Sequence, residues 1–451
     1  MRVNTSFAFL LAVSGNCFAE RLTIEQLVEQ GVHRYPSIRV SEAEVRQAAA
    51  GIQLARMTYL PKLDVIAGVN RATRNNSFGL LLPTQIIAPI SGPVLGGSSS
   101  GSTWGSTVGV LATWEPFDFG LRGATVAVAE ATKRLRESGI AQAQLEAATL
   151  IVDSALTWLA AEQAVKAAQA GVDRALELER ITEALVKAEL RAGAESSLAQ
   201  AEAASARIQV VRGRQAVEEA RSVVAALVGD PAVELSAARL LSLPEIAGNE
   251  PEVDRNPSVK AVDAAVAESQ AKLHALDRAY FPRFALQGTS YARGTGAMPD
   301  GQLLGGLNGL GPTVQNWGVG FTATFPILEL PSIRAKKAEE TARLDAERAR
   351  REQVLLNLKI QRDRALAAYR AALELAQTTP VLVASAKTGL EQIRARYQSG
   401  LGTALEVADA QRRLTQAEID DSLARLSIWR ARLAVYVAAG DLTPFLREAN
   451  R

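Results

Sequence analysis

The chain contains few of the residues that reactive sites need. Among its 451 residues are one cysteine, two histidines and three methionines, and only 5% of the residues are aromatic. This scarcity argues against metal-binding and thiol-based chemistry. Neither an H-E-x-x-H motif nor a phosphate-binding loop occurs in the sequence. We therefore predict that the protein is not an enzyme and has no catalytic residues, cofactor or metal.

Net charge and long hydrophobic runs are also lacking. Lys and Arg number 50 and Asp and Glu 48, which leaves a formal charge of +2. That balance provides no basic surface of the kind that binds nucleic acid. Beyond residue 20 no run reaches the ~18 uninterrupted apolar residues of a membrane helix. If the chain lies in a membrane, it must cross it as β-strands closed into a barrel.

The N-terminus is typical of an exported protein. A basic start is followed by an apolar run at residues 7–13 and by small residues that end at Ala19. Residues 1–19 are therefore predicted to be a secretory signal peptide. Its removal would leave no cysteine, because Cys17 is the only one, and a thiol-free chain suits an oxidising compartment. Asn16 before Cys17 disfavours lipid attachment at Cys17 without excluding it.

The distribution of proline indicates two long helical stretches. No proline occurs within residues 117–230, and only Pro380 interrupts residues 332–443. Helix interiors exclude proline, and both stretches are rich in the strong helix formers Ala, Leu, Glu, Arg and Gln. They predict two long helical hairpins that turn near Gly193 and Gly400. Helices as long as these two stretches allow must pack side by side along their length, as coiled coils do.

Four other segments alternate between apolar residues and small or polar ones. Trp317, Val319 and Phe321 share one parity, for example, and Gly318 and Gly320 share the other. This is the period of a β-strand. Each segment is close to the ~9–11 residues that a tilted strand needs to cross a bilayer, although a soluble sheet fits the same pattern. The predicted strands are residues 63–73, 106–115, 284–293 and 317–325.

The chain is a tandem duplication. Residues 36–63 and 257–284 align without a gap, and Tyr59 has an identical counterpart in Tyr280. Each half has a helix, such as the one predicted at residues 23–57, then two strands and a long helical hairpin. Four strands are too few to enclose a lumen, but twelve strands from three chains can do so. The predicted parts are a signal peptide (1–19), a first repeat (20–230), an equatorial linker (231–255), a second repeat (256–441) and a C-terminal tail (442–451).

Two motifs resemble those of the TolC family of outer-membrane channel proteins. Residues 114–122, WEPFDFGLR, are similar to the family's junction between strand and helix. Residues 397–411, YQSGLGTALEVADAQ, are similar to its signature at a helical hairpin tip. The resemblance covers nearly the whole chain after the signal peptide. It implies a mainly α-helical fold with a β-barrel portion, in which a homotrimer forms a 12-stranded barrel in the outer membrane of a Gram-negative cell and an α-helical tunnel in the periplasm.

The same resemblance implies a passive exit duct. Such a duct carries drugs or other small molecules outward from a periplasmic adaptor protein and an inner-membrane pump of the RND or ABC type. The outer-membrane component of a type I protein secretion system is one alternative, and a soluble periplasmic coiled-coil scaffold is another. The cargo stays open between drug, metal ion and protein, because the pump rather than the duct selects it.

The hairpin-tip motif also implies a gate. By its match to the family signature, Tyr397, Glu406 and Asp409 would lie where the tunnel closes at its periplasmic end. Glu406 and Asp409 are three residues apart and share a helix face, so three copies would form acidic rings that favour cations. On spacing alone, two solvated helix charges are the plainer interpretation. The family's gate often has a basic residue near the position of Gly402, and the adjacent sequence has none here.

Three further sets of residues are predicted to be functional. Gly171 and Pro380, each about 30 Å of helix from its tip, are a predicted hinge level, with a static kink as the alternative. Aromatic residues near the strand ends are predicted at the membrane interface, namely Tyr59, Trp104, Trp114, Tyr280 and Trp317. The tip residues predicted to contact the adaptor are Gly193, Ala194, Leu198, Gly400, Leu401, Gly402 and Leu405.

Overall fold

The computed structural model describes residues 21–73, 100–236, 238–244, 252–298 and 302–450. The predicted signal peptide, residues 1–19, lies outside this part of the chain. The chain divides into two compact units, and each takes residues from both sequence repeats. None of the described helices is both long and apolar enough to span a membrane. Unit 1 comprises residues 1–42, 138–260 and 352–451, and unit 2 comprises residues 43–137 and 261–351.

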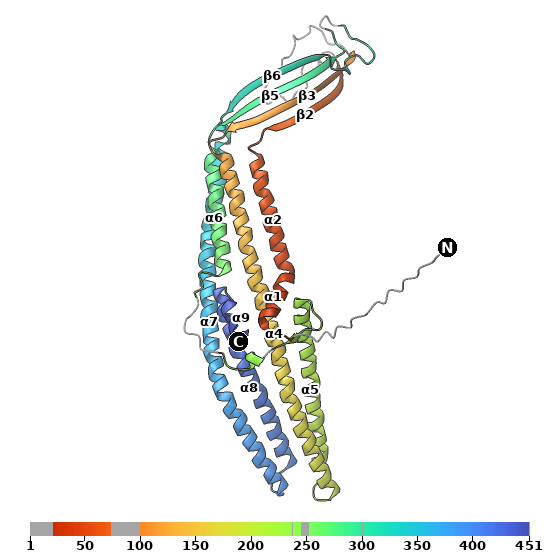
Figure 1. Ribbon diagram of the computed structural model, residues 1–451, viewed down its shortest axis with the longest axis vertical. Coiled ribbons are helices and arrows are strands. Elements are labelled where there is room, and N and C mark those ends of the chain that lie inside the picture. The colour runs from red at the N-terminus through yellow and green to blue at the C-terminus, as the bar shows by residue number, and fades with distance from the viewer. Residues whose placement is uncertain (1–20, 74–99, 237, 245–251, 299–301, 451) are drawn as a thin grey trace, which may run out of the picture. The chain divides into compact units, whose positions relative to one another are not determined.

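Unit 2 contains a four-stranded antiparallel sheet, which Figure 1 shows. The four strands follow one another across the sheet in sequence order. Their number agrees with the prediction. One face exposes apolar side chains, where Val65 is 74%, Trp317 79% and Val319 69% exposed. Glycine and polar residues predominate on the opposite face, because successive residues of a strand alternate between faces. The strands are β2 (Lys62–Thr73), β3 (Ser102–Phe117), β5 (Arg283–Thr295) and β6 (Val314–Thr324).

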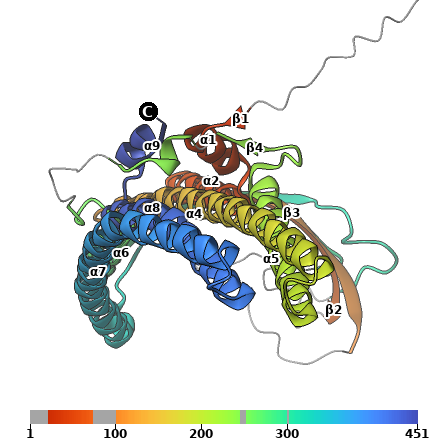
Figure 2. The ribbon, with the colours of Figure 1, turned by 90° about the horizontal axis from the view of Figure 1, so that it is seen from below.

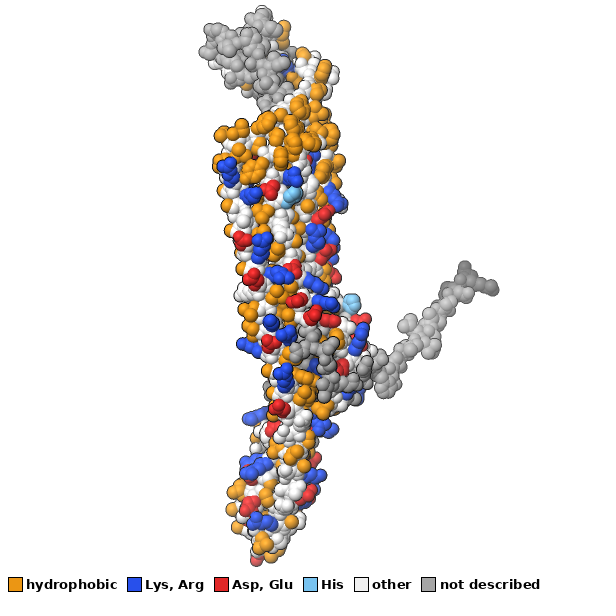
Figure 3. Space-filling model, turned by 90° about the vertical axis from the view of Figure 1, so that its left-hand side faces the viewer, with side chains coloured by type: hydrophobic (Ala, Val, Ile, Leu, Met, Phe, Trp, Pro, Cys, Tyr) orange, Lys and Arg blue, Asp and Glu red, His pale blue; other side chains and the backbone are white. Residues whose placement is uncertain are grey.

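The register of the sheet aligns the apolar positions of neighbouring strands. Val65 of β2 pairs with Val110 of β3, which pairs with Ser290 of β5, and Ser290 pairs with Trp317 of β6. β3 extends past its predicted bounds at both ends. Its first residue, Ser102, still pairs with β2, and its last, Phe117, still pairs with β5. Hydrophobic side chains crowd over the strand and helix ends of this unit in Figure 3, with few charges among them. An apolar face of this kind marks an interaction site for lipid or protein.

Four helices continue from the strands of unit 2. They lie in the order α2, α4, α6, α7, and a polar contact joins each neighbouring pair. Arg136 of α4 pairs with Glu44 of α2 at 3.3 Å, and the Thr132 hydroxyl of α4 donates to Glu268 of α6 at 2.7 Å. A 2.6 Å ion pair joins α6 and α7, from Asp277 to Lys337. The helices are α2 (Pro36–Met57), α4 (Leu121–Lys187), α6 (Pro257–Arg278) and α7 (Leu330–Gln398), and a short 3-10 helix, η2 (Ile327–Glu329), precedes α7.

Unit 1 contains the two helical hairpins. The second parts of α4 and α7 lie beside two further long helices in the order α7, α8, α4, α5 (Figures 1 and 2). Two short helices and a two-stranded parallel sheet lie against one face of this layer (Figure 2). The long helices are α5 (Gly193–Val228) and α8 (Ala404–Ala439), and the short elements are β1 (Arg21–Leu22), α1 (Ile24–Arg34), β4 (Glu234–Leu235), the 3-10 helix η1 (Ala238–Leu241) and α9 (Thr443–Asn450).

The largest core of unit 1 lies where the short elements meet the long helices. Trp429 and Phe445 are fully buried there, with ring centroids 6.0 Å apart in an edge-to-face arrangement. The Trp429 indole N–H donates to the carbonyl oxygen of Ser242 at 2.9 Å. A buried 2.6 Å ion pair between Arg432 and Glu448 ties α9 to α8. The short elements therefore pack as part of this unit and are not loose appendages.

The second part of α7 packs as a coiled coil. Four of its buried residues, Leu358, Ala365, Ala372 and Thr379, lie seven positions apart, which is the repeat that keeps one seam facing a partner helix. Pro380 follows Thr379 on the exposed side, and α7 continues through it as one helix. At this level the Thr379 hydroxyl donates to Asp421 of α8 at 2.7 Å.

One predicted helix differs from the structure. The single helix predicted at residues 23–57 is two helices, α1 and α2, because Tyr35 precedes Pro36 and is extended there, with a ψ of 122°. A residue before proline is disfavoured in the helical region, and proline is favoured at the first position of a new helix. The predicted tail at residues 442–451 contains helix α9, and the predicted linker at residues 231–255 contains β4 and η1.

Candidate functional site

The tips of the two hairpins are tight turns that need unusual backbone angles. The chain leaves α7 through Gly400, whose φ of 81° is left-handed and favours glycine. A side chain on Gly402 would put its Cβ 3.0 Å from the Glu406 carboxylate and 3.2 Å from the backbone nitrogen of Tyr397. Gly402 therefore allows a close backbone approach. In the first hairpin the left-handed residue is Glu189, with a φ of 60°, and Gly193 begins α5 instead.

A cluster around Tyr397 joins the two tips. Tyr397, at the end of α7, is only 2% exposed, and its hydroxyl donates to Glu195 of α5 at 3.2 Å. Arg191, in the first turn, stacks on the Tyr397 ring with its guanidinium carbon 5.1 Å from the ring centroid. It also forms a 3.4 Å ion pair with Glu195 and donates to the carbonyl oxygen of Gly402 at 3.2 Å. Arg191, Glu195 and Tyr397 thus bind the first hairpin to the second.

Arg191 is a residue of this cluster that the sequence did not indicate. No basic residue is adjacent to Gly402 in the sequence, but Arg191 reaches Gly402 from a position 211 residues away. The only sequence signal is its place beside the first tip, two residues before Gly193. A basic side chain therefore lies beside Gly402 in space, contributed by the opposite hairpin of the same chain.

The surroundings of Tyr397 keep its hydroxyl protonated. Burial, followed by the charge of Glu195 and the hydrogen bond to it, raises the pKa of Tyr397 to about 12. A protonated hydroxyl remains a donor to Glu195 at every physiological pH. Because the unfolded chain loses this proton first, the associated stability is present below pH ~10 and is lost as the pH rises toward the folded pKa.

Replacing Tyr397 with phenylalanine is expected to test this linkage. The wild-type advantage over Tyr397→Phe should shrink by about 1–2 kcal/mol between pH 10 and pH 12, because only the wild type has this hydroxyl to ionise. Urea unfolding of both proteins across this pH range measures the difference. An advantage that stays constant would show that the Tyr397 proton is not linked to folding.

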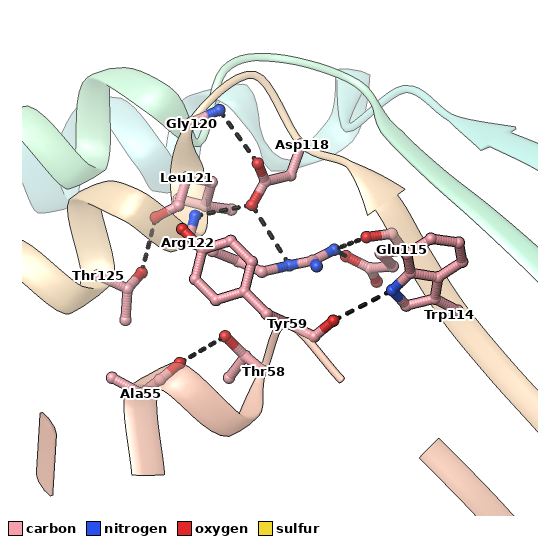
Figure 4. A network of polar contacts seen from close by, with 10 residues as sticks. All are labelled: Ala55, Thr58, Tyr59, Trp114, Glu115, Asp118, Gly120, Leu121, Arg122 and Thr125. Atoms are coloured by element: carbon pink, nitrogen blue, oxygen red, sulfur yellow. Dashed lines mark hydrogen bonds and ion pairs between the residues drawn. The ribbon is translucent and has the colours of Figure 1, made fainter. Parts of the chain in front are cut away.

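A second polar cluster joins strand to helix within unit 2, and Figure 4 shows it. Arg122, in the first turn of α4, is 8% exposed and lies between Glu115 at 3.5 Å and Asp118 at 3.4 Å. Asp118 also accepts the backbone N–H groups of Gly120 at 3.1 Å and Arg122 at 2.7 Å, so it caps the helix. These residues all belong to the motif WEPFDFGLR, which is therefore the mechanical joint between β3 and α4.

Aromatic residues surround this joint. The Arg122 guanidinium carbon lies 5.5 Å from the centroid of the Tyr59 ring, and the Trp114 indole N–H donates to the Tyr59 carbonyl oxygen at 3.1 Å. Tyr59 and Trp114 are 47% and 41% exposed, and Tyr280 is half-buried. Trp104 and Trp317 lie toward the opposite ends of β3 and β6. The five predicted interface aromatics therefore fall into two groups along the strands.

The chain matches the family described as outer membrane efflux protein over residues 27–230 and 252–441. These residues include both hairpin tips and the strand-to-helix joint. The chain belongs to the outer membrane efflux protein family. The predicted resemblance is confirmed, and the protein is an outer-membrane efflux channel and not an enzyme.

Individual relatives agree with this family. The pyoverdine export outer membrane protein OpmQ of Pseudomonas aeruginosa is 23% identical over 427 residues, which are 92% of this chain and 85% of OpmQ. The structure of the outer-membrane channel OprN has a TM-score of 0.73 and 23% identity, covering 92% of this chain and 89% of OprN. VceC of Vibrio cholerae has a TM-score of 0.71 and 18% identity, covering 92% of this chain and 96% of VceC. The predicted fold class is confirmed.

Both carboxylates predicted at the gate of this efflux protein have partners within the chain. Glu406 forms a capping box with Thr403, accepting the Thr403 N–H at 3.1 Å while its own N–H donates to the Thr403 hydroxyl at 3.3 Å. Asp409 pairs with Arg413 at 2.9 Å and with Arg412 at 3.7 Å. Glu406 therefore stabilises the start of α8, a role that the T-x-x-E spacing indicates. Among the described residues, no group of histidines and carboxylates is arranged to hold a metal.

The residues predicted to contact an adaptor are apolar, and several of them are glycine or alanine with little side-chain bulk. Leu401 is 73% and Leu405 54% exposed, although both are large hydrophobic side chains. Gly193, Ala194 and Gly400 are exposed as well. Leu198 is half-buried and Gly402 is buried, so these two contribute to packing inside the chain. Adaptor contact stays a prediction for the whole set.

Gly171, one of the two predicted hinge residues, lies at a close contact between α4 and α8. A Cβ at this position would be 2.8 Å from the Thr415 hydroxyl oxygen and 3.1 Å from its methyl carbon. One turn on, Arg174 forms a forked ion pair with Glu418 at 3.1 and 2.7 Å and donates to Thr415 at 2.8 Å. Glycine at this position therefore permits the close packing that lets Arg174 reach α8, and α4 is an unbroken helix here.

Adding one methyl group is expected to disturb this contact. Gly171→Ala should lower the free energy of unfolding by about 1–2 kcal/mol, because Thr415 must move and overpacking costs energy. Gly139→Ala is the matched control, since Gly139 is also in α4 but a Cβ there would meet nothing within 4 Å. The control should be neutral or more stable, as alanine is the better helix former. Equal melting temperatures for the two variants would contradict the close-contact role.

Proposed function

We propose that three copies of this chain form the outer-membrane duct of a tripartite export system for small molecules. The observation that carries the proposal is the pair of unpartnered edges of the helical layer in unit 1. α5 exposes Ile208 at 52% and Val211 at 65%, while α7, at the other edge, exposes Leu375 at 56% and Leu382 at 49%. Different edges that meet head to tail generate a closed ring of copies.

The sheet of unit 2 has a matching pair of open edges. Among the described strands, β2 and β6 lie at the edges of the sheet, and the backbone groups on their outer sides need partners inside a lipid layer. Pairing β6 of one copy with β2 of the next supplies those partners, and three copies then contribute twelve strands around a water-filled lumen. The exposed apolar face would contact lipid and the small polar face would line the lumen. A soluble scaffold would expose this apolar face to water, which soluble proteins rarely do, so this alternative is disfavoured.

The helical hairpins are proposed to lie in the periplasm and to dock an adaptor at their tips. Exposed leucines beside exposed glycines offer apolar contact with little side-chain bulk, which suits interdigitation with another helical hairpin. The adaptor would connect the duct to an inner-membrane pump of the RND or ABC type. The name of OpmQ specifies pyoverdine export, and that favours a small-molecule cargo over the secretion of proteins.

Expression of the full-length chain in a Gram-negative host tests the proposal. We expect the protein in the outer-membrane fraction, with a native mass of three chains and a stepwise ionic conductance in planar bilayers. A crosslinker attached through Leu401→Cys should capture a periplasmic adaptor, whereas one attached at Thr125→Cys, in unit 2, should not. A stable monomer in the soluble periplasmic fraction would support the scaffold alternative and overturn the duct.

A further inference from the structure

The more polar face of the sheet in unit 2 carries the positive charge of Arg293. On β5 this face is formed by alternate residues that include Gln287, Thr289, Tyr291 and Arg293, since the intervening residues share the apolar face. Arg293 lies near the end of β5 that is farthest from α6, ten residues after the strand begins at Arg283.

The neighbours of Arg293 do not neutralise it. Its backbone partners across the sheet are Thr107 of β3 and Val314 of β6, neither of which is charged. No described carboxylate is paired with its guanidinium in the structure. The acidic residue Asp64 of β2 faces the same side but aligns, through Leu111, with Thr289. That position is four residues away along the strand, about 13 Å at 3.3 Å per residue.

We propose that Arg293 makes the outer part of the lumen favour anionic cargo. The proposal rests on the trimeric duct proposed above, in which this face lines the water-filled channel. Three copies of Arg293 would then form a ring of positive charge close to the exit, and rings of Arg or Lys favour anions in pores. The cargo class is a small molecule that carries carboxylate, sulfonate or phosphate groups.

The physical range of this charge decides how it can be detected. The screening length is about 30 Å at 0.01 M salt but only about 3 Å at 1 M. The interaction energy between a guanidinium and a unit charge ~6 Å away is about half a kcal/mol in water at low salt. It should therefore accelerate an approaching anion and slow an approaching cation at low salt, and have almost no effect at high salt.

A reporter thiol beside Arg293 can measure this effect without depending on the gate at the hairpin tips. Val314 is the cross-strand neighbour of Arg293 and is 52% exposed. Because Cys17 is the only cysteine and lies in the predicted signal peptide, Val314→Cys provides the single thiol of the mature chain. Purified trimers are treated with a negatively charged sulfonatoethyl methanethiosulfonate or its positively charged trimethylammonioethyl counterpart, and the two rates are compared.

The expected result is a charge-dependent rate ratio at low salt. In 0.01 M salt, Arg293→Gln should lower the anionic-to-cationic rate ratio about fivefold, and Arg293→Lys should preserve it. Arg71→Gln is the matched control and should change it little, because Arg71 lies on the opposite face of the sheet, over the Trp104 ring at 5.4 Å. In 1 M salt the difference between these proteins should disappear.

A second reporter keeps the test decisive if Arg293→Gln does not assemble. With Arg293 intact and Asp64 replaced by Asn, because Asp64 aligns with Thr289, the ratio at Val314→Cys should be at least about twofold higher than at Thr289→Cys, which is farther from Arg293. Equal ratios at the two reporters, or an unchanged ratio in trimeric Arg293→Gln, would overturn the anion preference. Failure of every variant and of the parent chain to form trimers would instead contradict the proposed duct.

Discussion

If the cluster of Arg191, Glu195 and Tyr397 holds the tip of the proposed duct closed, replacing Arg191 with leucine is expected to open it. The change removes the stacking on Tyr397, the ion pair with Glu195 and the hydrogen bond to Gly402. Losing a largely buried charged donor, and leaving its acceptors unpaired, costs about 2–4 kcal/mol. That cost would shift the balance between closed and open tips by at least about tenfold, since ~1.4 kcal/mol is a factor of ten. The mean conductance of reconstituted trimers should rise accordingly.

Planar-bilayer recordings at fixed voltage measure this change, and sensitivity of cells to a large antibiotic provides a second measurement. Lys187→Leu is the matched control, because Lys187 is near the same tip but its side chain is 75% exposed and, among the described residues, is paired with Glu183. Exposed pairs of this kind contribute little. If the Arg191→Leu and Lys187→Leu channels conduct alike, Arg191 does not hold the tips together.

A double-mutant cycle would assign the effect within the cluster. Glu195→Gln keeps an acceptor for the Tyr397 hydroxyl but loses the charge that pairs with Arg191. If the three residues act as one unit, the effects of Arg191→Leu and Glu195→Gln on conductance should be clearly less than additive. Additive effects would mean that the two residues act on the tip separately.

Truncating Arg122 is expected to produce the largest loss of stability in unit 2. Its side chain is only 10% exposed, and removing it leaves Asp118 and Glu115 without their cation and Tyr59 without its stacking partner. Removing one member of a buried charged cluster costs about 3 kcal/mol. Arg122→Ala should therefore lower the melting temperature of the trimer by several degrees.

Two further variants decide whether the geometry of Arg122 matters. Arg122→Lys keeps the charge but loses the planar fork that contacts two acceptors, so it should recover only part of the stability. Arg334→Ala, at an exposed position of α7 in the same unit, should be close to wild type. If Arg122→Ala and Arg334→Ala have equal melting temperatures, the Arg122 cluster does not stabilise the protein.

The hairpin tips show where sequence reasoning stops. The motif at residues 397–411 indicates a tip, and the spacing of Thr403 and Glu406 indicates a capping box, because both depend on residues within one turn. The contact between Arg191 and Gly402 joins positions 211 residues apart. No local pattern contains that pairing, since it depends on how one hairpin packs against the other.

Local chemistry alone determined the helices, the strands and the duplication of this chain. Proline-free stretches exclude breaks, strict alternation separates the two faces of each strand, and both signals act between close neighbours. The break at Tyr35 could have been read from Pro36, but helix α9 acquires its role only through packing on α8. Tertiary structure alone decided which charges meet. The contacts of Arg191 at the tip and of Arg174 with α8, and the lack of a described carboxylate beside Arg293, each depend on the register between distant segments. That register is set by whole packed faces rather than by any single residue.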